Sequence, residues 1–150
     1  MSDAGEVQRL IAVARAERRA GRLDTALVAQ RAAARLLGAT PRNADYAHAL
    51  RHVVDILVEA GRPHEATAIC AEVVALYKDL PDADPLDIAN AIRSAAMHAV
   101  ATGDRQAARL LWIEARERYS GLDDRFARLT GKADNPGVSE ADEQLAALKP

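Results

Sequence analysis

The sequence of 150 residues is poor in cysteine and in aromatic residues, and it contains no long apolar run. Its single cysteine, Cys70, excludes an internal disulfide framework and a cysteine-rich zinc site. An aromatic share of 3% argues against an aromatic-lined cofactor cavity and favours helices that pack closely through Ala, Leu and Val. No apolar run reaches the roughly 18 residues of a membrane span, and the first residues lack the pattern of a secretion signal. We therefore expect a cytoplasmic protein that does not bind membranes.

The sequence also lacks an excess of one charge, because its formal net charge is −2. No global field therefore draws nucleic acid or an anionic membrane to the protein. The eight glycines are scattered singly, so a glycine-rich phosphate loop is missing, and no serine lies in the motif of a nucleophile. These absences argue against an enzyme of familiar mechanism and against a cofactor.

What the sequence does contain is helical pattern with regular punctuation. Apolar residues make up 49% of the chain, enough for one continuous core. Gly21, Gly61 and Gly103 each separate two helical patterns and are 40 and then 42 residues apart. A glycine at such a point predicts a tight turn with positive φ, and a fixed period of this length indicates structural repeats.

The segments around these glycines keep one register. Asp45-Tyr46-Ala47 aligns with Asp87-Ile88-Ala89 at the 42-residue offset, and Tyr77 aligns with Tyr119 in the same way. Small residues that would let helices approach closely recur five and twelve residues after each glycine: Ala26, Ala66 and Ala108, then Ala33, Val73 and Ala115. The repeat therefore extends through whole helical hairpins.

The pattern predicts six main helices and their ends. Asn43, Asp84 and Asp104 are expected as N-caps, Pro63 in the first turn of its helix, and the other prolines of this region in the connections. The predicted helices cover residues 6–20, 23–37, 44–60, 63–79, 86–102 and 104–119. The connecting prolines are Pro41, Pro81 and Pro85.

The predicted fold is all-α: a right-handed α-α superhelix of three helix-turn-helix repeats, which bury their apolar faces by stacking. The repeat domain spans 1–130, with repeats at about 6–38, 44–80 and 86–120. A short capping helix over 122–130 would point Phe126 and Leu129 inward. The polar, acidic stretch 131–150 is expected to be a flexible tail, with a marginal helix over 139–148.

The repeats resemble tetratricopeptide repeats, in the 42-residue variant found in kinesin light chains and in bacterial regulatory repeat proteins. The resemblance covers residues 6–120. It is carried by Ala60-Gly61-Arg62 with Glu65-Ala66, by Thr102-Gly103-Asp104 with Ala107-Ala108, by Tyr46-Ala47 and Ala49-Leu50, and by Trp112 in a second helix.

This resemblance implies a peptide groove, because the first helices of successive repeats line the concave face of such solenoids. The resemblance therefore implies a non-catalytic adaptor that binds a protein or peptide in this groove. The candidate partner-binding residues on that face are Arg15, Arg19, His48, Arg51, His52, Asp55, Asn90, Arg93 and Met97. Ile11 and Arg18 share the face. The Lys/Asn pattern by which chaperone-binding members clamp a terminal carboxylate is not reproduced, because Ile11 and Arg15 occupy its first-repeat positions.

Two interpretations of the recurring arginines stay open. Guanidinium groups suit carboxylates, so Arg15, Arg51 and Arg93 would hold an acidic segment or a chain terminus of the partner. Alternatively, they form the solvated side of amphipathic helices.

Other chemistry is less well supported by the sequence. His48, His52 and Asp55 have metal-ligand spacing on one helix face, but the neighbouring Arg51 opposes a cation, so no metal is expected. A basic first repeat could contact phosphates, yet no aromatic residues are interleaved for stacking, so nucleic acid ranks last. Self-association through terminal repeats or the tail is the main alternative to the adaptor, because a solenoid exposes apolar end faces.

Overall fold

The computed structural model describes residues 3–40, 43–132 and 134–149. Within these ranges the chain forms α-helices, one 3₁₀ helix and no β-strand, so the all-α prediction is confirmed. The chain divides into two compact units, Met1–Pro81 and Asp82–Pro150. None of the described helices is long and apolar enough to span a membrane.

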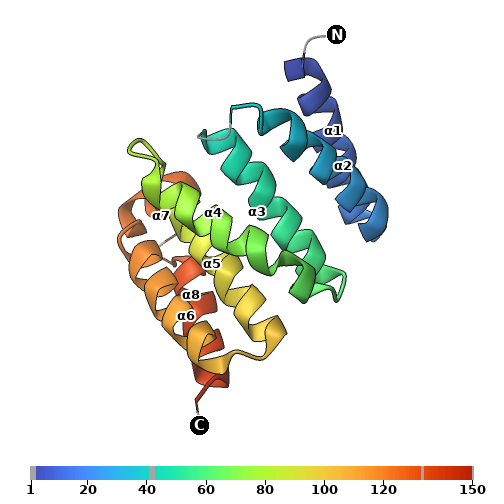
Figure 1. Ribbon diagram of the computed structural model, residues 1–150. Coiled ribbons are helices and arrows are strands. Elements are labelled where there is room, and N and C mark those ends of the chain that lie inside the picture. The colour runs from blue at the N-terminus through green and yellow to red at the C-terminus, as the bar shows by residue number, and fades with distance from the viewer. Residues whose placement is uncertain (1–2, 41–42, 133, 150) are drawn as a thin grey trace. The chain divides into compact units, whose positions relative to one another are not determined.

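The first unit contains two helical hairpins. Its elements are α1 (Asp3–Arg19), α2 (Leu23–Leu37), α3 (Ala44–Glu59), η1 (Pro63–Ala66) and α4 (Thr67–Asp79). Helix α1 packs on α2, α2 packs on α3, and α3 packs on η1 and α4 (Figure 1). The predicted helix over 63–79 is therefore two elements, because the chain begins with a 3₁₀ turn at Pro63 before the α-helix starts at Thr67.

The predicted glycine turns are confirmed, and all three have the same hydrogen bonds. Gly21, Gly61 and Gly103 have φ values of 78°, 73° and 82°. The residue after each glycine donates its N–H to a carbonyl five residues back, and the glycine donates to one three residues back. This Schellman arrangement satisfies carbonyls that the helix end leaves open, and it requires the left-handed conformation that glycine adopts without strain.

The predicted caps and close contacts are confirmed as well. Asn43 Oδ1 accepts from the Tyr46 N–H at 2.7 Å, Asp84 Oδ1 from Leu86 at 2.9 Å, and Asp104 Oδ1 from Ala107 at 3.0 Å. Residues expected at close helix contacts are buried: Ala26, Ala66, Ala108, Ala33, Val73 and Ala115. Pro85, expected just before its helix, is the helix's first residue, and Pro41 lies outside the described residues.

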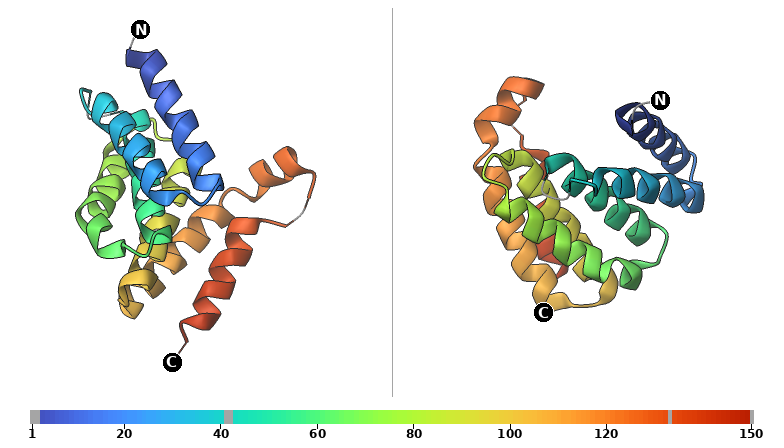
Figure 2. Two further views of the ribbon diagram at one scale, coloured as in Figure 1. Left: turned by 90° about the vertical axis from the view of Figure 1, so that its right-hand side faces the viewer. Right: turned by 45° about the horizontal axis from the view of Figure 1, so that its top comes forward.

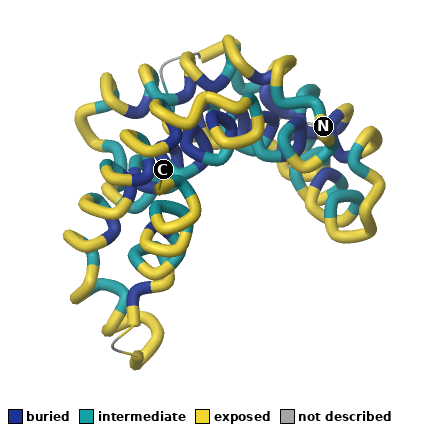
Figure 3. The backbone as a smooth tube through the Cα atoms, turned by 90° about the horizontal axis from the view of Figure 1, so that it is seen from below, coloured by how far each residue is buried: buried dark blue, intermediate teal, exposed yellow. Residues whose placement is uncertain are grey.

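The second unit is a hairpin covered by a C-terminal helix. Its elements are α5 (Pro85–Thr102), α6 (Arg105–Ser120), α7 (Asp123–Thr130) and α8 (Pro136–Ala147). Helix α6 packs against both α5 and α8. Ile92, Trp112, Tyr119 and Ala141 are each at most 3% exposed and form its core. In both units the buried residues lie where helices face one another, and the outer faces are exposed (Figure 3).

The C-terminal segment differs from the prediction. The expected cap over 122–130 corresponds to α7, which buries no residue, and the inward position predicted for Leu129 is wrong because Leu129 is 71% exposed. Helix α7 extends beyond the hairpin, whereas α8 lies along α6 (Figure 2). The acidic stretch expected as a flexible tail thus supplies the helix that covers the hairpin, since Ala141 packs at the interface with no exposed surface.

Candidate functional site

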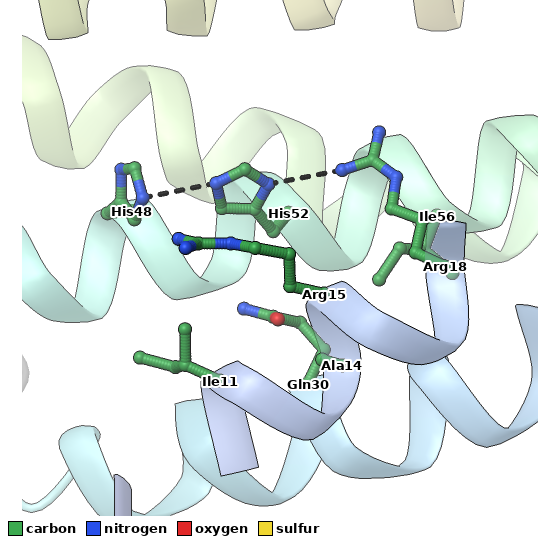
Figure 4. A pocket seen from close by; sticks show the side chains of 8 residues that line it. All are labelled: Ile11, Ala14, Arg15, Arg18, Gln30, His48, His52 and Ile56. Carbon is green, nitrogen blue, oxygen red and sulfur yellow. Dashed lines mark hydrogen bonds between the residues drawn. The ribbon is translucent and has the colours of Figure 1, made fainter. Parts of the chain in front are cut away.

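A small basic pocket lies in the first unit between α1, α2 and α3. Its volume is about 80 Å³, enough for several water molecules or one small polyatomic group. Helical spacing brings the lining side chains together, because residues three and four apart share a helix face. The lining residues are Ile11, Ala14, Arg15 and Arg18 of α1, Gln30 of α2, and His48, His52 and Ile56 of α3 (Figure 4).

The two arginines of the pocket differ in how they are held. Arg18 is fixed by Glu59 of α3: its Nε lies 3.0 Å from both carboxylate oxygens, and its Nη2 also contacts Glu59. Arg18 Nη1 lies 3.4 Å from His52 Nδ1. Arg15 makes no hydrogen bond or ion pair with any described residue, and its side chain extends toward the histidine pair (Figure 4). Its guanidinium donors are therefore available to a ligand.

His48 and His52 form an imidazole pair on α3. Their Nε2 atoms are 3.1 Å apart, and their rings meet edge to face with centroids 4.5 Å apart. At that distance one ring must donate the shared proton and the other accept it, so the two rings cannot both be charged while the bond persists. His48 is exposed and His52 is half-buried.

The pocket disfavours further positive charge at His52. Burial lowers the pKa of His52 to about 3, and Arg51, His48, Arg18 and Arg15 add to the shift through repulsion. His52 is therefore neutral at physiological pH. The repulsion adds to the effect of burial because none of the residues that line the pocket is a carboxylate.

Gln30 is the polar residue that the sequence analysis missed in this pocket. It is 4% exposed, and its Nε2 donates to the Ala49 carbonyl oxygen at 3.1 Å, which joins α2 to α3. A signal was present, because Gln30 interrupts the apolar face formed by Leu27, Ala33 and Ala34. Glu59 was also missed, and its contact with Arg18 spans 41 residues that no local pattern connects.

Other predicted residues of the first unit lie outside the pocket lining. Arg51 and Asp55 pair with each other at 3.4 Å, and their side chains are 11% and 14% exposed. The Arg51 Nε is buried and has no hydrogen-bond partner among the described residues. Arg19 is exposed on α1 and makes no hydrogen bond or ion pair with a described residue. Arg51 is thus largely enclosed, whereas Arg15 and Arg19 remain accessible.

The predicted residues of the second unit have partners within that unit. Asn90 Oδ1 accepts from the Tyr119 hydroxyl at 2.6 Å. Arg93 forms a two-pronged pair with Glu140 of α8, in which Nη2 lies 2.9 Å from Oε2 and Nε contacts Oε1. Met97 is half-buried on α5. The Glu140 contact was missed because the stretch that carries it was expected to be flexible.

The described residues include no group of three or more His, Cys, Asp or Glu side chains that could hold a metal ion. Cys70 is buried, and burial followed by the charge of Asp55 raises the pKa of its thiol to about 11. The thiol therefore stays protonated near neutral pH, which makes it a poor nucleophile. The chemistry of the site is thus that of two arginines and two imidazoles facing a small cavity.

Comparison of the chain with models of known protein families gave no match, and comparison with curated protein sequences gave none either.

Proposed function

We propose that the chain is a non-catalytic interaction module of the tetratricopeptide type, whose first helices bind an acidic segment of a partner protein. The repeated glycine turns and the repeated small residues at hairpin contacts support this proposal. In the proposed arrangement the three hairpins stack as a right-handed solenoid, and α1, α3 and α5 line its concave face.

The pairing of Arg93 with Glu140 carries the proposal. Helix α8 is rich in acid, and two of its carboxylates contact the hairpin beneath it: Glu140 meets Arg93 on α5, and Asp142 meets Arg116 on α6, with Nε 2.6 Å from Oδ1. An acidic helix thus already lies on basic residues of one hairpin. Arg15 and Arg19 on α1 are first-helix arginines that pair with no carboxylate among the described residues, and a partner's acidic segment would bind there.

Fluorescence anisotropy with a labelled peptide of Asp, Glu and Ala tests this function. The matched control peptide replaces the acids with Asn and Gln. The acidic peptide should bind and the amide peptide should not, and binding should weaken as salt screens the charges. Equal binding of the two peptides would contradict the proposal.

A charge-reversal variant locates the binding face. Arg15→Glu with Arg19→Glu should reduce affinity for the acidic peptide at least about tenfold, since it removes two charge-assisted contacts. The control is Arg109→Glu with Arg128→Glu, which changes the net charge equally at two exposed arginines of the second unit that have no described partner. Equal losses in both variants would indicate unspecific attraction.

Self-association is the second candidate, and the position of α8 favours it. The helix is held to its hairpin by ion pairs that are about one-third to one-half exposed and by the buried side chain of Ala141. Exchange of α8 between two copies would keep these contacts while joining the chains. Light scattering over a concentration series tests it, and a monomer at every concentration would count against it.

A further inference from the structure

The pocket between α1 and α3 has an unbalanced charge. None of its eight lining residues is acidic. Glu59 compensates Arg18, and Asp55 compensates Arg51, but no described carboxylate pairs with Arg15. Gln30, the polar lining residue from α2, is neutral. One positive charge is therefore uncompensated beside a cavity that holds a small group.

The donors around the cavity match an oxyanion in number and type. Arg15 contributes open N–H groups, and Arg18 is fixed by Glu59 with Nη1 directed at His52. A carboxylate or phosphate oxygen placed between Arg15 and the rings would accept from a guanidinium group and from an imidazole N–H. Such charge-assisted bonds are stronger than neutral ones.

The imidazole pair adds a second property to such a site. Without an anion, His52 is neutral, because burial and, after it, the repulsion of Arg51, His48, Arg18 and Arg15 lower its pKa. A bound anion would reverse the local potential. One ring could then take a proton from solvent, and the shared Nε2–Nε2 contact would give way to an N–H donated to the anion.

We infer that this pocket is an oxyanion subsite, which takes a carboxylate or phosphate group of a bound peptide together with one proton accepted by the His48–His52 pair. The inference rests on the proposed function, since it names the group that the first unit recognises in a partner. The cavity of about 80 Å³ sets the size of the group. Binding should strengthen as pH falls from neutral, because protons are taken up with the anion.

A divalent cation is the competing occupant. Two imidazoles one helical turn apart are a known metal pair. Here the cation would lie beside Arg15 and Arg18, and no lining carboxylate would offset their charge. Repulsion between these positive charges opposes binding of the cation. The geometry therefore favours the anion, and a metal titration belongs in the test.

NMR titration of the histidine ring protons, with inorganic phosphate and with acetate as probes, tests the subsite. The full chain should show the pKa of one ring of the pair rising by about one unit or more at saturating phosphate or acetate. Arg15→Gln should abolish that rise, while Arg109→Gln, a charge-matched control on α6, should leave it intact. Histidine signals that respond to neither anion, or that respond to Zn²⁺ alone, would overturn the inference.

Three peptides distinguish the source of the oxyanion: one with a free terminal carboxylate, the same peptide with an amidated terminus, and one with an internal phosphoserine. If the free-terminus or the phosphoserine peptide competes with phosphate or acetate for the pocket, and the amidated peptide does not, the result supports the subsite and identifies its ligand. Competition by none would overturn it. If the acidic peptide binds but the histidine signals do not respond to the anions, the proposed function stands and the subsite does not. If the histidine signals respond to the anions but the acidic peptide does not bind, the proposed function alone is overturned.

Discussion

His52 is a single residue of the pocket that makes the folded chain less stable in acid. Its pKa is lowered to about 3 from the ordinary histidine value of 6.5, so the unfolded chain takes up a proton between these pH values and the folded chain does not. His52 therefore leaves folding stability unaffected above pH 6.5 and lowers it progressively as pH falls toward 3. Ion-paired carboxylates such as Asp84, whose pKa is lowered chiefly by its hydrogen bond with Arg125, add acid sensitivity of the same sign.

A substitution of His52 measures how much this residue contributes to the pH dependence of folding stability. We expect His52→Gln to lose about 1–2 kcal/mol less stability than the wild type between pH 7 and pH 4, after allowance for partial solvent screening. Urea denaturation at both pH values measures this difference. His64→Gln is the control, because His64 is exposed on η1 and contacts no charged group among the described residues. Identical pH dependence of the wild type and the His52 variant would be incompatible with the proposed electrostatics.

Gly137 is a second residue with a specific requirement. A Cβ placed there would lie 2.5 and 2.7 Å from two ring carbons of Tyr119, although its backbone is not left-handed. Gly137→Ala should therefore destabilise the protein by about 1–3 kcal/mol through overpacking. Gly121→Ala is the matched control, because its Cβ would meet only backbone oxygens at 3.5 and 3.8 Å.

Thermal unfolding followed by circular dichroism compares the two alanine variants. The control should fall within about 1 kcal/mol of the wild type and can exceed it, since alanine restricts the unfolded chain. A Gly137 variant as stable as the control would show that α8 does not pack on Tyr119 as described.

At the scale of elements, Asn135 decides whether α8 forms. Its Oδ1 accepts from the N–H groups of Gly137 and Val138, and its Nδ2 donates to Tyr119 O at 2.7 Å and to Asp123 Oδ1 at 2.8 Å. It is 7% exposed. Asn135→Ala should cost about 2 kcal/mol, because it removes the cap and leaves a buried carbonyl without its donor.

Hydrogen exchange locates this effect. Amides of 136–147 should exchange faster in Asn135→Ala, whereas Asn43→Ala, which removes the cap of α3, should act on 44–59 instead. Unchanged protection of 136–147 in Asn135→Ala would mean that α8 does not depend on this cap.

Local pattern predicted the elements up to Ser120 well, because their ends are set by neighbouring residues. Gly61, Asn43 and Asp104 each mark a turn or cap that a short window reveals. The stability of helix α8 was underestimated because its sequence is polar and acidic. The helix is held by tertiary contacts with Tyr119, Arg93 and Arg116. The pairing of Arg51 with Asp55 was also unforeseen, since four-residue spacing permits either a shared ligand or an ion pair.

For the whole molecule, we propose that charge complementarity determines the choice of partner. The chain has a net charge of −2, and Arg15, Arg18 and Arg19 lie together on α1, whereas α8 carries Glu140, Asp142 and Glu143 and no basic residue. A partner segment rich in acid would bind where α8 does not supply one. The candidate face in the first unit consists of the basic pocket and the neighbouring exposed Arg19.

Two-dimensional amide NMR of the full chain, titrated with the acidic peptide, tests this central claim most directly. We expect the largest shifts in α1 and α3, around Arg15, Arg18 and His52, and smaller ones elsewhere. The Arg15→Glu, Arg19→Glu variant should lose these shifts while its spectrum stays dispersed. Saturable shifts confined to other helices, or none when the peptide is in excess, would contradict the account.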